Sequence, residues 1–361
     1  MSSSSTLRLL ATWTRCSPCP RELASWNPAV AADHCTWPGV KCAGGGGGVV
    51  EELNLPGLNL SGTVPASVCM LKNLTRLDLS GNGLSGTFPT TALCACSQLR
   101  FLDLSYNSFA GPLPADINGL SPAMEHLNIS SNSFDGTMPA EFAKLTKLTT
   151  LKMFDMNLTG EIPKAFSSLT ELRVIILDSN QLNGSIPAWV WQHRKLEYIS
   201  LWDNRLSGEL PHNIKAVNLI GLDLSINQLT GDIPEGFGNL KNLTLLVLGN
   251  NQFTGTIPTS IGLLPQLRFI WLDNNHLSGE LPPELGKHST LCANGKLYNI
   301  DASNNSFSGE LPANLGDCVD LVYLDLSSNR FSGAIPADSI GLLKKLERLD
   351  LSDNEFSSIR W

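Results

Sequence analysis

The residues of this 361-residue chain that could perform catalysis or hold a metal are its six histidines, nine cysteines and 33 acidic residues. No histidine stands beside a serine or cysteine in a recognisable nucleophile–base arrangement, and no His or Cys spacing is that of a zinc site. The run Gly44–Gly48 lacks the Lys-Ser/Thr that follows a phosphate-binding loop, and it precedes an expected strand rather than a helix. The sequence therefore predicts a protein that is not an enzyme and holds no metal or cofactor.

A repeated pattern dominates the chain and explains most of its aspartates. LTRLDLSGNGLSGTFP begins at Leu74, and closely similar segments begin at Leu99, Leu243 and Leu321. The template is LxxLxLxxNxLxGxIP, followed by about eight linking residues. Its asparagine column falls at positions 58, 82, 107, 132, 156, 180, 204, 227, 251, 275, 305, 329 and 354. Position 58 is Leu and position 156 is Met, and the steps are 23 to 25 residues except for one of 30. The chain thus contains thirteen coils, the first and last imperfect.

Each part of the template has a physical role. The LxL alternation points leucines inward from a short strand, and stacked coils pair these strands into one parallel sheet. The asparagine amide can satisfy backbone groups of its own coil and of the adjacent coil. No coil can bury its leucines alone. The pattern therefore predicts an α/β leucine-rich-repeat right-handed solenoid, with the parallel sheet on the concave face and 3-10 or loop segments on the convex face.

The chain divides into three segments: an irregular stretch at 1–22, a cap at 23–49 and the repeats at 50–361, whose last coil is incomplete. The leucine-rich patch of the first segment is interrupted by Arg8 and is too short for a convincing signal peptide. The 30-residue step falls near 283–296, where either a partial coil has been lost or a few residues have been inserted. Both origins predict a local bulge there.

The cap has its own signature, LASWNP followed by CTWPGVKC. We expect Cys35 and Cys42 to close a small loop, because the two residues are close in the sequence and the chain is rich in cysteine. Trp26 and Trp37 are expected to cover the core that the first coil leaves exposed.

Two further cysteine pairs follow from the register of the repeats. Cys69 and Cys292 each lie five residues before the first leucine of a coil, and Cys96 and Cys318 each lie three residues before one. Adjacent coils stack about 4.8 Å apart, and disulfide Cα atoms are usually about 4.4–6.8 Å apart. The register predicts the disulfides Cys69–Cys96 and Cys292–Cys318, with buried free thiols as the alternative. Three cysteines remain, of which the first two could pair: Cys16, Cys19 and Cys94.

Seven Asn-x-Ser/Thr sequons suit a secreted glycoprotein. They begin at Asn59, Asn73, Asn128, Asn157, Asn183, Asn242 and Asn304. The template itself supplies Asn near Ser or Thr, so each sequon can also be a by-product of the repeat. Asn128 lies on a concave strand and is expected to remain unmodified. Together with the disulfides, the sequons predict an oxidising, extracellular compartment.

The outward residues of the concave strands differ along the chain. LDLS recurs in coils toward both ends, where we expect small, solvated side chains, whereas the middle coils carry large aromatic residues. Exposed aromatic residues are costly unless they bind a partner. We expect an extended peptide to contact these residues: Lys152, Phe154, Asp178, Tyr198, Trp202, Asp203, Phe269, Trp271 and Asp273. The alternative is that Phe154 and Phe269 only pack against neighbouring outward residues.

The LxGxIP coils, which follow a Trp…CxWxGVxC cap, resemble the ectodomains of plant leucine-rich-repeat receptor-like kinases. The sequences of the coils look closest to those of the HAESA-like group. The resemblance covers about residues 23–356. It implies an ectodomain outside the plasma membrane, a secreted peptide or protein ligand, and a possible co-receptor with a short leucine-rich-repeat ectodomain. In full-length relatives it also implies one membrane helix and a cytoplasmic Ser/Thr kinase used in signalling.

The chain departs from this family pattern in several places. The N-terminal helix of the cap is poorly formed, and the chain stops at SSIRW without a second cap, a membrane span, or the HRD and DFG motifs of a kinase. We therefore expect an ectodomain truncated before the membrane span and the kinase. The HAESA-like group holds its peptide's carboxylate with an Arg-x-Arg pair, and no Arg-x-Arg occurs in this chain.

The bulk composition narrows the function further. The net charge is −8, with no sign of the clustered basic face that nucleic acids require, and no run of 18 apolar residues could span a membrane. We therefore expect a ligand-binding ectodomain in receptor-kinase signalling. Two alternatives remain: a secreted inhibitor of a cell-wall-degrading enzyme, resembling the polygalacturonase-inhibiting proteins, and a truncated product without function.

Overall fold

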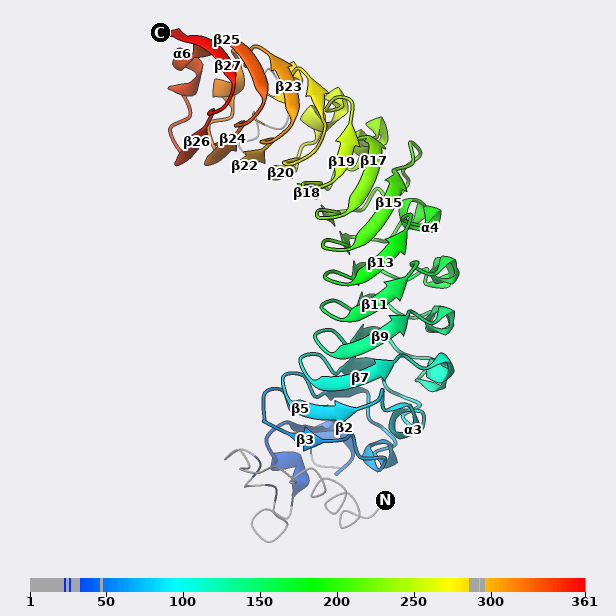
Figure 1. The fold of residues 1–361 in the computed structure, drawn as a ribbon. Coiled ribbons are helices and arrows are strands. Elements are labelled where there is room, and N and C mark those ends of the chain that lie inside the picture. Colours follow the sequence, from blue (N-terminus) through cyan, green and yellow to red (C-terminus); the bar gives the residue numbers. More distant parts are fainter. Residues whose placement is uncertain are drawn as a thin grey trace. The chain divides into compact units, whose positions relative to one another are not determined.

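The computed structural model describes Leu23, Trp26 and residues 33–45, 48–285, 292 and 296–360. The irregular stretch at 1–22, with Cys16 and Cys19, and most of the expected bulge near 283–296 lie outside these residues. By its contacts the chain forms two compact units, Met1–Gln181 and Leu182–Trp361. Each unit is a stack of coils with the same construction (Figure 1).

In the first unit, the inner sheet contains one short strand from each coil. Its strands are β1 (Val40–Cys42), β2 (Val50–Asn54), β4 (Arg76–Asp78), β6 (Phe101–Asp103), β8 (His126–Asn128), β10 (Thr150–Lys152) and β12 (Val174–Ile176). β1 is antiparallel to β2, and every later pair is parallel and in register. A second parallel sheet is formed by the LxGxIP part of the coils. Its strands are β3 (Ser61–Gly62), β5 (Gly83–Gly86), β7 (Ser108–Pro112), β9 (Ser133–Thr137) and β11 (Asn157–Gly160).

The second unit repeats this arrangement, again with parallel strands in both sheets. Its inner strands are β14 (Tyr198–Ser200), β16 (Gly221–Asp223), β18 (Leu245–Val247), β20 (Phe269–Trp271), β22 (Asn299–Asp301), β24 (Tyr323–Asp325) and β26 (Arg348–Asp350). Its second-sheet strands are β15 (Arg205–Glu209), β17 (Gln228–Asp232), β19 (Gln252–Thr254), β21 (Ser278–Gly279), β23 (Ser306–Gly309), β25 (Arg330–Pro336) and β27 (Glu355–Arg360). β13 (Gln181–Gly184) contains the boundary between the units.

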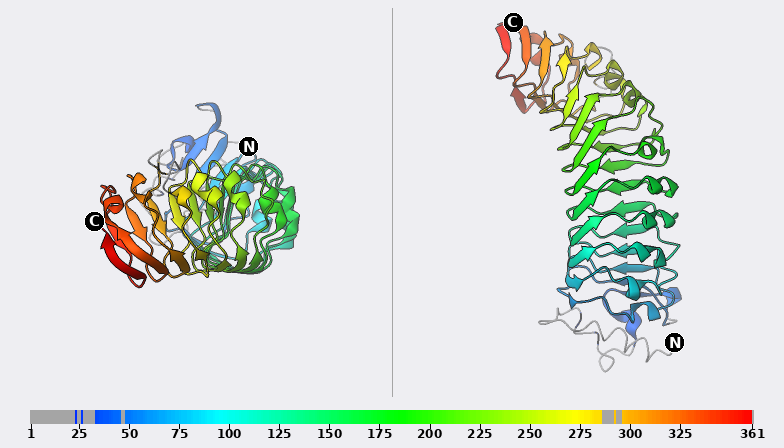
Figure 2. Two further views of the ribbon diagram at one scale, coloured as in Figure 1. Left: turned by 90° about the horizontal axis from the view of Figure 1, so that it is seen from above. Right: turned by 45° about the vertical axis from the view of Figure 1, so that its right-hand side comes forward.

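Short helices, mostly 3-10, lie in the links, and Figure 2 shows them on the side of each stack opposite the inner strands. In the first unit they are η2 (His34–Thr36), η3 (Ala43–Gly45), η4 (Val68–Met70), α3 (Thr90–Leu93), η5 (Ala115–Gly119), η6 (Ala140–Lys144) and η7 (Lys164–Ser168). In the second unit they are α4 (Ala188–Gln192), η8 (Glu235–Asn239), η9 (Thr259–Leu263), η10 (Pro283–Leu285), η11 (Leu315–Asp317) and α6 (Ala337–Ile340). Parallel inner strands with 3-10 links make each unit a leucine-rich-repeat solenoid, as the sequence predicted.

The core consists of the inward leucines of the inner strands and a stack of phenylalanines beneath the second sheet. Leu77, Leu102 and Leu127, at equivalent positions of adjacent coils, are fully buried. The rings of Phe109 and Phe134 stack in parallel with centroids 6.1 Å apart. Each coil therefore buries its apolar side chains against its neighbours.

The template asparagines bond to the backbone of their own coil and of the coil before it. Asn132 donates from Nδ2 to the carbonyls of Leu104, Ile129 and Ser130 at 3.0–3.1 Å, and its Oδ1 accepts from the Phe109 amide at 3.0 Å. The same pattern recurs at these positions: Asn82, Asn107, Asn180, Asn227, Asn251, Asn275, Asn305, Asn329 and Asn354. This ladder satisfies buried carbonyls that could not otherwise reach a donor.

The residue just before this asparagine column has a positive φ in every coil. Glycine occupies the site at Gly57 and Gly81, and later coils use Asn, Asp or Ser, which tolerate that conformation. Tyr106 and Ile226 are the exceptions, with φ of 54° and 50°. A β-branched residue in this region is strained, so the fold imposes the turn at Ile226 against local preference.

The cap and disulfides have the arrangement expected from the sequence. Trp26 and Trp37 are buried and stacked, with ring centroids 5.4 Å apart. Cys35 is bonded to Cys42. The pairs expected from register are bonded too, with Cα separations of 4.6 Å for Cys69–Cys96 and 4.4 Å for Cys292–Cys318. Cys94 is an exposed free thiol.

The 30-residue step does not interrupt the inner sheet. β20 and β22, on either side of the step, pair in parallel, with Phe269 opposite Asn299 and Trp271 opposite Asp301. The 30-residue step therefore leaves the register of the inner strands unchanged.

Candidate functional site

The outward side chains of the inner strands form the candidate site, and we number the LxxLxLxxN motif from 1 to 9. Positions 3, 5 and 7 point away from the leucines, and position 8 carries the positive φ. Because the strands pair in register, residues at one position form a row across neighbouring coils.

In the LDLS coils the aspartate at position 5 bonds to the serine at position 7. Asp103 Oδ1 accepts from the Ser105 amide at 2.9 Å and from its hydroxyl at 2.6 Å, and Asp325 bonds Ser327 in the same way. Ser105 and Asp325 are also buried. The expectation of solvated side chains was therefore wrong for these two residues, whereas the other Asp and Ser residues of the LDLS coils are half-buried or exposed.

In the second unit, three predicted aromatic residues are exposed on the inner face. Tyr198 is at position 3 of its coil, Trp202 at position 7 and Trp271 at position 5, with 45%, 36% and 39% of their surface exposed. The Trp271 indole donates from Nε1 to Asn299 Oδ1 at 3.1 Å. Hydrogen bonding of this kind orients an exposed ring without burying it, which suits a contact surface.

Small residues lie between the coils that carry these rings. Gly221 and Gly249 occupy outward positions in the two intervening coils, and Val247 is buried between them. A Cβ on Gly221 would lie 2.9 Å from Tyr198 Cδ1, so the tyrosine ring covers this glycine. A Cβ on Gly249 would likewise meet Asp273 Oδ1, so side chains of the adjacent coils lie against both glycines.

The acidic residues of this face differ in what they bind. Asp273 Oδ2 accepts from the side-chain amides of Asn250 and Asn274 at 2.9 and 2.7 Å, so it already has partners within the protein. Asp203 is exposed and adopts a φ of 55°. Burial raises the pKa of Asp223 above its ordinary value, while bonds from Ser225 oppose the shift. Burial also raises the pKa of Asp301.

The rings of two predicted aromatic residues pack against neighbouring aromatic rings. The ring of Phe154, in the first unit, meets Tyr106 edge to face with centroids 6.2 Å apart. The ring of Phe269, in the second unit, packs on Tyr298 at 5.6 Å. Both are half-buried, which agrees with the alternative that they pack on outward neighbours.

The other predicted residues of the first unit, Lys152 and Asp178, are half-buried on the same inner face. Lys152 lies at position 5 in β10 and Asp178 at position 7 of the following coil. Four of the nine predicted residues lie within inner strands, namely Lys152, Tyr198, Phe269 and Trp271, and the other five lie in the turns that follow those strands. Three of the nine belong to the first unit and six to the second.

A stacked group of three side chains at position 3 of the first unit was missed. The guanidinium carbon of Arg76 lies 3.4 Å from the centroid of Phe101, and the Phe101 ring stacks on His126 at 4.2 Å with an interplanar angle of 4°. Burial lowers the pKa of His126 to about 4, Asp103 opposes this shift, and Lys152 adds to it. His126 is therefore neutral at physiological pH and stacks as an uncharged ring.

A sequence signal for this group existed. All three residues stand immediately before the second leucine of LxxLxL, in the same column as Tyr198. In the coils of Arg76 and Phe101 the column directly precedes the LDLS segment.

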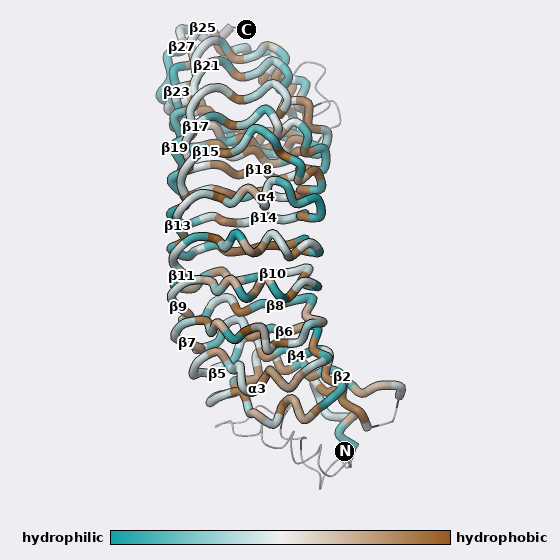
Figure 3. Tube along the Cα trace, turned by 90° about the vertical axis from the view of Figure 1, so that its right-hand side faces the viewer, coloured by the Kyte–Doolittle hydropathy of each residue, from teal (hydrophilic) through white to brown (hydrophobic). Residues whose placement is uncertain are grey.

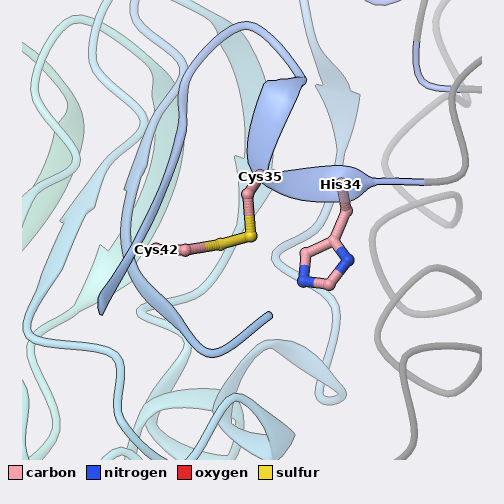
Figure 4. A group of neighbouring side chains, drawn as sticks. All are labelled: His34, Cys35 and Cys42. Carbon is pink, nitrogen blue, oxygen red and sulfur yellow. A yellow bond between two sulfur atoms is a disulfide. The ribbon is translucent and has the colours of Figure 1, made fainter. Parts of the chain in front are cut away.

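One cluster in the cap has metal-binding residue types. The ligand atoms of His34, Cys35 and Cys42 lie within 4.8 Å of one another (Figure 4). The two sulfurs are bonded to each other, so neither is available as a thiolate ligand. The His34 ring nitrogen Nε2 instead hydrogen bonds to the Gly48 carbonyl at 2.9 Å.

Six of the seven sequon asparagines are exposed, and Asn128 is the buried one. Asn128 donates to Asp103 Oδ2 at 2.9 Å and accepts from the Ser130 amide at 3.2 Å. A glycan on Asn128 Nδ2 would have to start from a buried side chain and replace its bond to Asp103.

Family models of the leucine-rich repeat match the chain. One matches residues 218–277, and a second matches six further stretches: 73–93, 98–120, 123–145, 195–216, 296–318 and 320–342. The matches and the coil architecture agree, and the chain belongs to the leucine-rich-repeat family.

Within that family the chain is similar to plant receptor kinases. It is 46% identical over 63 residues to the leucine-rich repeat receptor protein kinase EMS1 of Arabidopsis thaliana, covering 18% of this chain and 5% of that protein. It is 46% identical over 74 residues to receptor protein kinase WSS1 of Oryza sativa subsp. japonica, covering 20% and 8%. The chain thus matches only a small part of these longer proteins. In the described residues, no helix is sufficiently long and apolar to cross a membrane.

Solved plant receptor structures share the fold. The PEPR1-AtPEP1 structure matches with a TM-score of 0.77 and 35% identity, covering 82% of this chain and 41% of that one. RGFR1 in complex with RGF2, described as a plant peptide hormone receptor, matches with a TM-score of 0.72 and 34% identity, covering 82% and 50%. HAESA with IDA and SERK1 matches with a TM-score of 0.51 and 25% identity, covering 99% and 78%. The likeness is therefore to plant leucine-rich-repeat receptor ectodomains, HAESA among them.

Proposed function

We propose that the inner face binds an extended peptide and that the protein acts as the extracellular recognition part of a receptor system, without catalysis of its own. The observation that carries this proposal is the exposure of Tyr198, Trp202 and Trp271 on one sheet face. Exposed aromatic side chains of this size are typical of binding anchors.

The shape and chemistry of the face support a peptide as the ligand. Tyr198 and Trp202 stand on one coil and Trp271 on a coil three further along, so an extended peptide that crosses the intervening coils would contact both groups of rings. Asp203 and Asp223 are acceptors for peptide amides. Two structural neighbours, PEPR1 and RGFR1, were solved with AtPEP1 and RGF2.

An extracellular location forms part of the proposal. Three disulfides and six exposed sequon asparagines suit an oxidising compartment with access to glycosylation. A secreted peptide ligand and a co-receptor with a short leucine-rich-repeat ectodomain are the partners proposed.

The test begins with selection of binders from a library of peptides of about 12 residues, followed by fluorescence polarisation with the best binder. The double variant Trp202→Ala/Trp271→Ala is expected to raise Kd at least about 30-fold, since each anchor contributes more than about 1 kcal/mol. Met70→Ala removes an exposed apolar side chain from η4, in a link away from the inner strands, and should change Kd less than about twofold. An unchanged Kd in the double variant, or no binder to the wild-type protein, would remove the proposal.

A further inference from the structure

The convex side of the second unit has a recess where one link lacks a helix. The links before and after it contain α4 and η8, whereas residues 210–220, all within the described chain, contain no helical turn. The step across this link, from Asn204 to Asn227, is 23 residues and is the shortest in the chain. Figure 3 shows this side of the coils, with α4 labelled. The links on either side each contain a helical turn and this link does not, so a hollow remains between them.

The hollow has a volume of about 460 Å³, and side chains from three successive links surround it. Its lining residues are Arg194, Ile214, Lys215, Val217, Asn239 and Lys241. We call it the basic notch. Three of its six lining residues are cationic and none is acidic, although the chain as a whole has a net charge of −8.

The short link is held in place by the coil before it. The Lys215 amide donates to the Trp191 carbonyl at 2.7 Å, and the Asn218 side-chain amide donates to the Arg194 carbonyl at 2.7 Å. These bonds shape the notch without a ligand. They also occupy main-chain groups that a bound peptide would need for pairing.

The three cations lack counter-charges within the described chain. Arg194, Lys215 and Lys241 are exposed, and none of them takes part in a salt bridge among the described residues. Like charges around one hollow raise the local positive potential, and a bound anion would lower their mutual repulsion.

We propose that the basic notch binds an anionic oligosaccharide, a linear chain of sugars that carry carboxylates. The cations come from three successive links, and coils stack about 4.8 Å apart at their strands, so the charges form a row rather than a point. A row of cations matches a ligand with repeated charges better than a single small anion. This site is independent of the peptide surface on the inner face.

The uncharged lining residues suit a sugar. Ile214 is buried at the base and Val217 is half-exposed, which gives apolar surface for the C–H faces of a sugar ring. The Asn239 side-chain amide can both donate to and accept from hydroxyl groups. An acidic peptide would gain the charge contacts without these two features.

Calorimetric titration with an unsubstituted hexagalacturonate tests the proposal, with its fully methyl-esterified form as a neutral control. The triple variant Arg194→Gln/Lys215→Gln/Lys241→Gln is expected to raise Kd at least tenfold. The charge-matched triple Lys144→Gln/Lys147→Gln/Lys164→Gln, at exposed link positions of the first unit, should change Kd less than twofold. Binding should weaken with added salt, because the contacts are between exposed charges.

A second pair of variants, both at Val217, tests the proposal separately in case the triple variant fails to fold. Val217→Glu places a carboxylate in the notch and should abolish binding, whereas Val217→Gln should retain it, with thermal unfolding as the check on folding. Equal Kd values in the two triple variants would overturn the proposal. It would also be overturned by equal binding of the esterified sugar, of hexaglutamate or of inorganic phosphate.

Discussion

At the scale of residues, outward positions of the inner strands do more than face solvent. The Asp–Ser pairs tie their turns together, and Arg76, Phe101 and His126 form one stack across three coils. In that stack the unprotonated form of His126 is favoured, because burial and nearby cations disfavour its charge.

His126 should make stability depend on pH. Its pKa is about 4 in the folded protein and about 6.5 in an unfolded chain, so the unfolded state binds more protons between these values. The free energy of unfolding should therefore fall as pH drops from about 6.5 to about 4. Urea midpoints measured across this range should show a shallower slope for His126→Gln than for the wild type. His276→Gln, an exposed histidine, should retain the wild-type slope. Equal slopes for wild type and His126→Gln would contradict this account.

At the scale of elements, the asparagine ladder joins each coil to the one before it. Coil 5 is an exception, because Met156 occupies the ladder position and is buried. The ladder is thus interrupted within the first unit, between Asn132 and Asn180.

This interruption offers a matched pair of substitutions. Asn132→Leu should lower the free energy of unfolding by about 2–4 kcal/mol, since it leaves buried backbone groups of Leu104, Ile129 and Phe109 without a partner. Met156→Leu introduces the same residue where no ladder bonds exist and should cost less than about 1.5 kcal/mol. Urea denaturation followed by circular dichroism measures both, and similar losses in the two variants would refute the role given to the ladder.

At the scale of the whole molecule, stability depends on each coil being covered by neighbours. Leu349 in β26 is 40% exposed, whereas Leu324 at the same position of β24 is 1% exposed. Protection of the backbone amides from hydrogen exchange should follow this difference in leucine exposure.

Hydrogen exchange can measure the difference in protection between β24 and β26. The amides of β26 should exchange at least about tenfold faster than those of β24, because local opening of a poorly covered coil costs less free energy. The amides of β20, whose central Ile270 is buried, serve as the internal reference. Equal protection of β24 and β26 would show that burial by neighbours does not control local stability here.

The repeat pattern alone predicted the inward leucines, the backbone bonds of the asparagines and the disulfides Cys69–Cys96 and Cys292–Cys318, while the closeness of Cys35 and Cys42 predicted the third disulfide. These features recur at each coil and depend on register, which can be counted along the chain. The nine predicted residues also lie on the inner strands or in the turns directly after them, because alternation within each strand sets which side chains point away from the leucines.

Only the tertiary structure decided which outward side chains meet one another. Tyr198 covers Gly221, Phe154 packs on Tyr106, and Arg76 stacks on Phe101, all between residues of different coils. Such contacts depend on the size and rotamer of side chains brought together by stacking, which periodicity does not specify. The basic notch has the same origin: a one-residue difference in link length becomes a hollow only when the neighbouring links keep their helices.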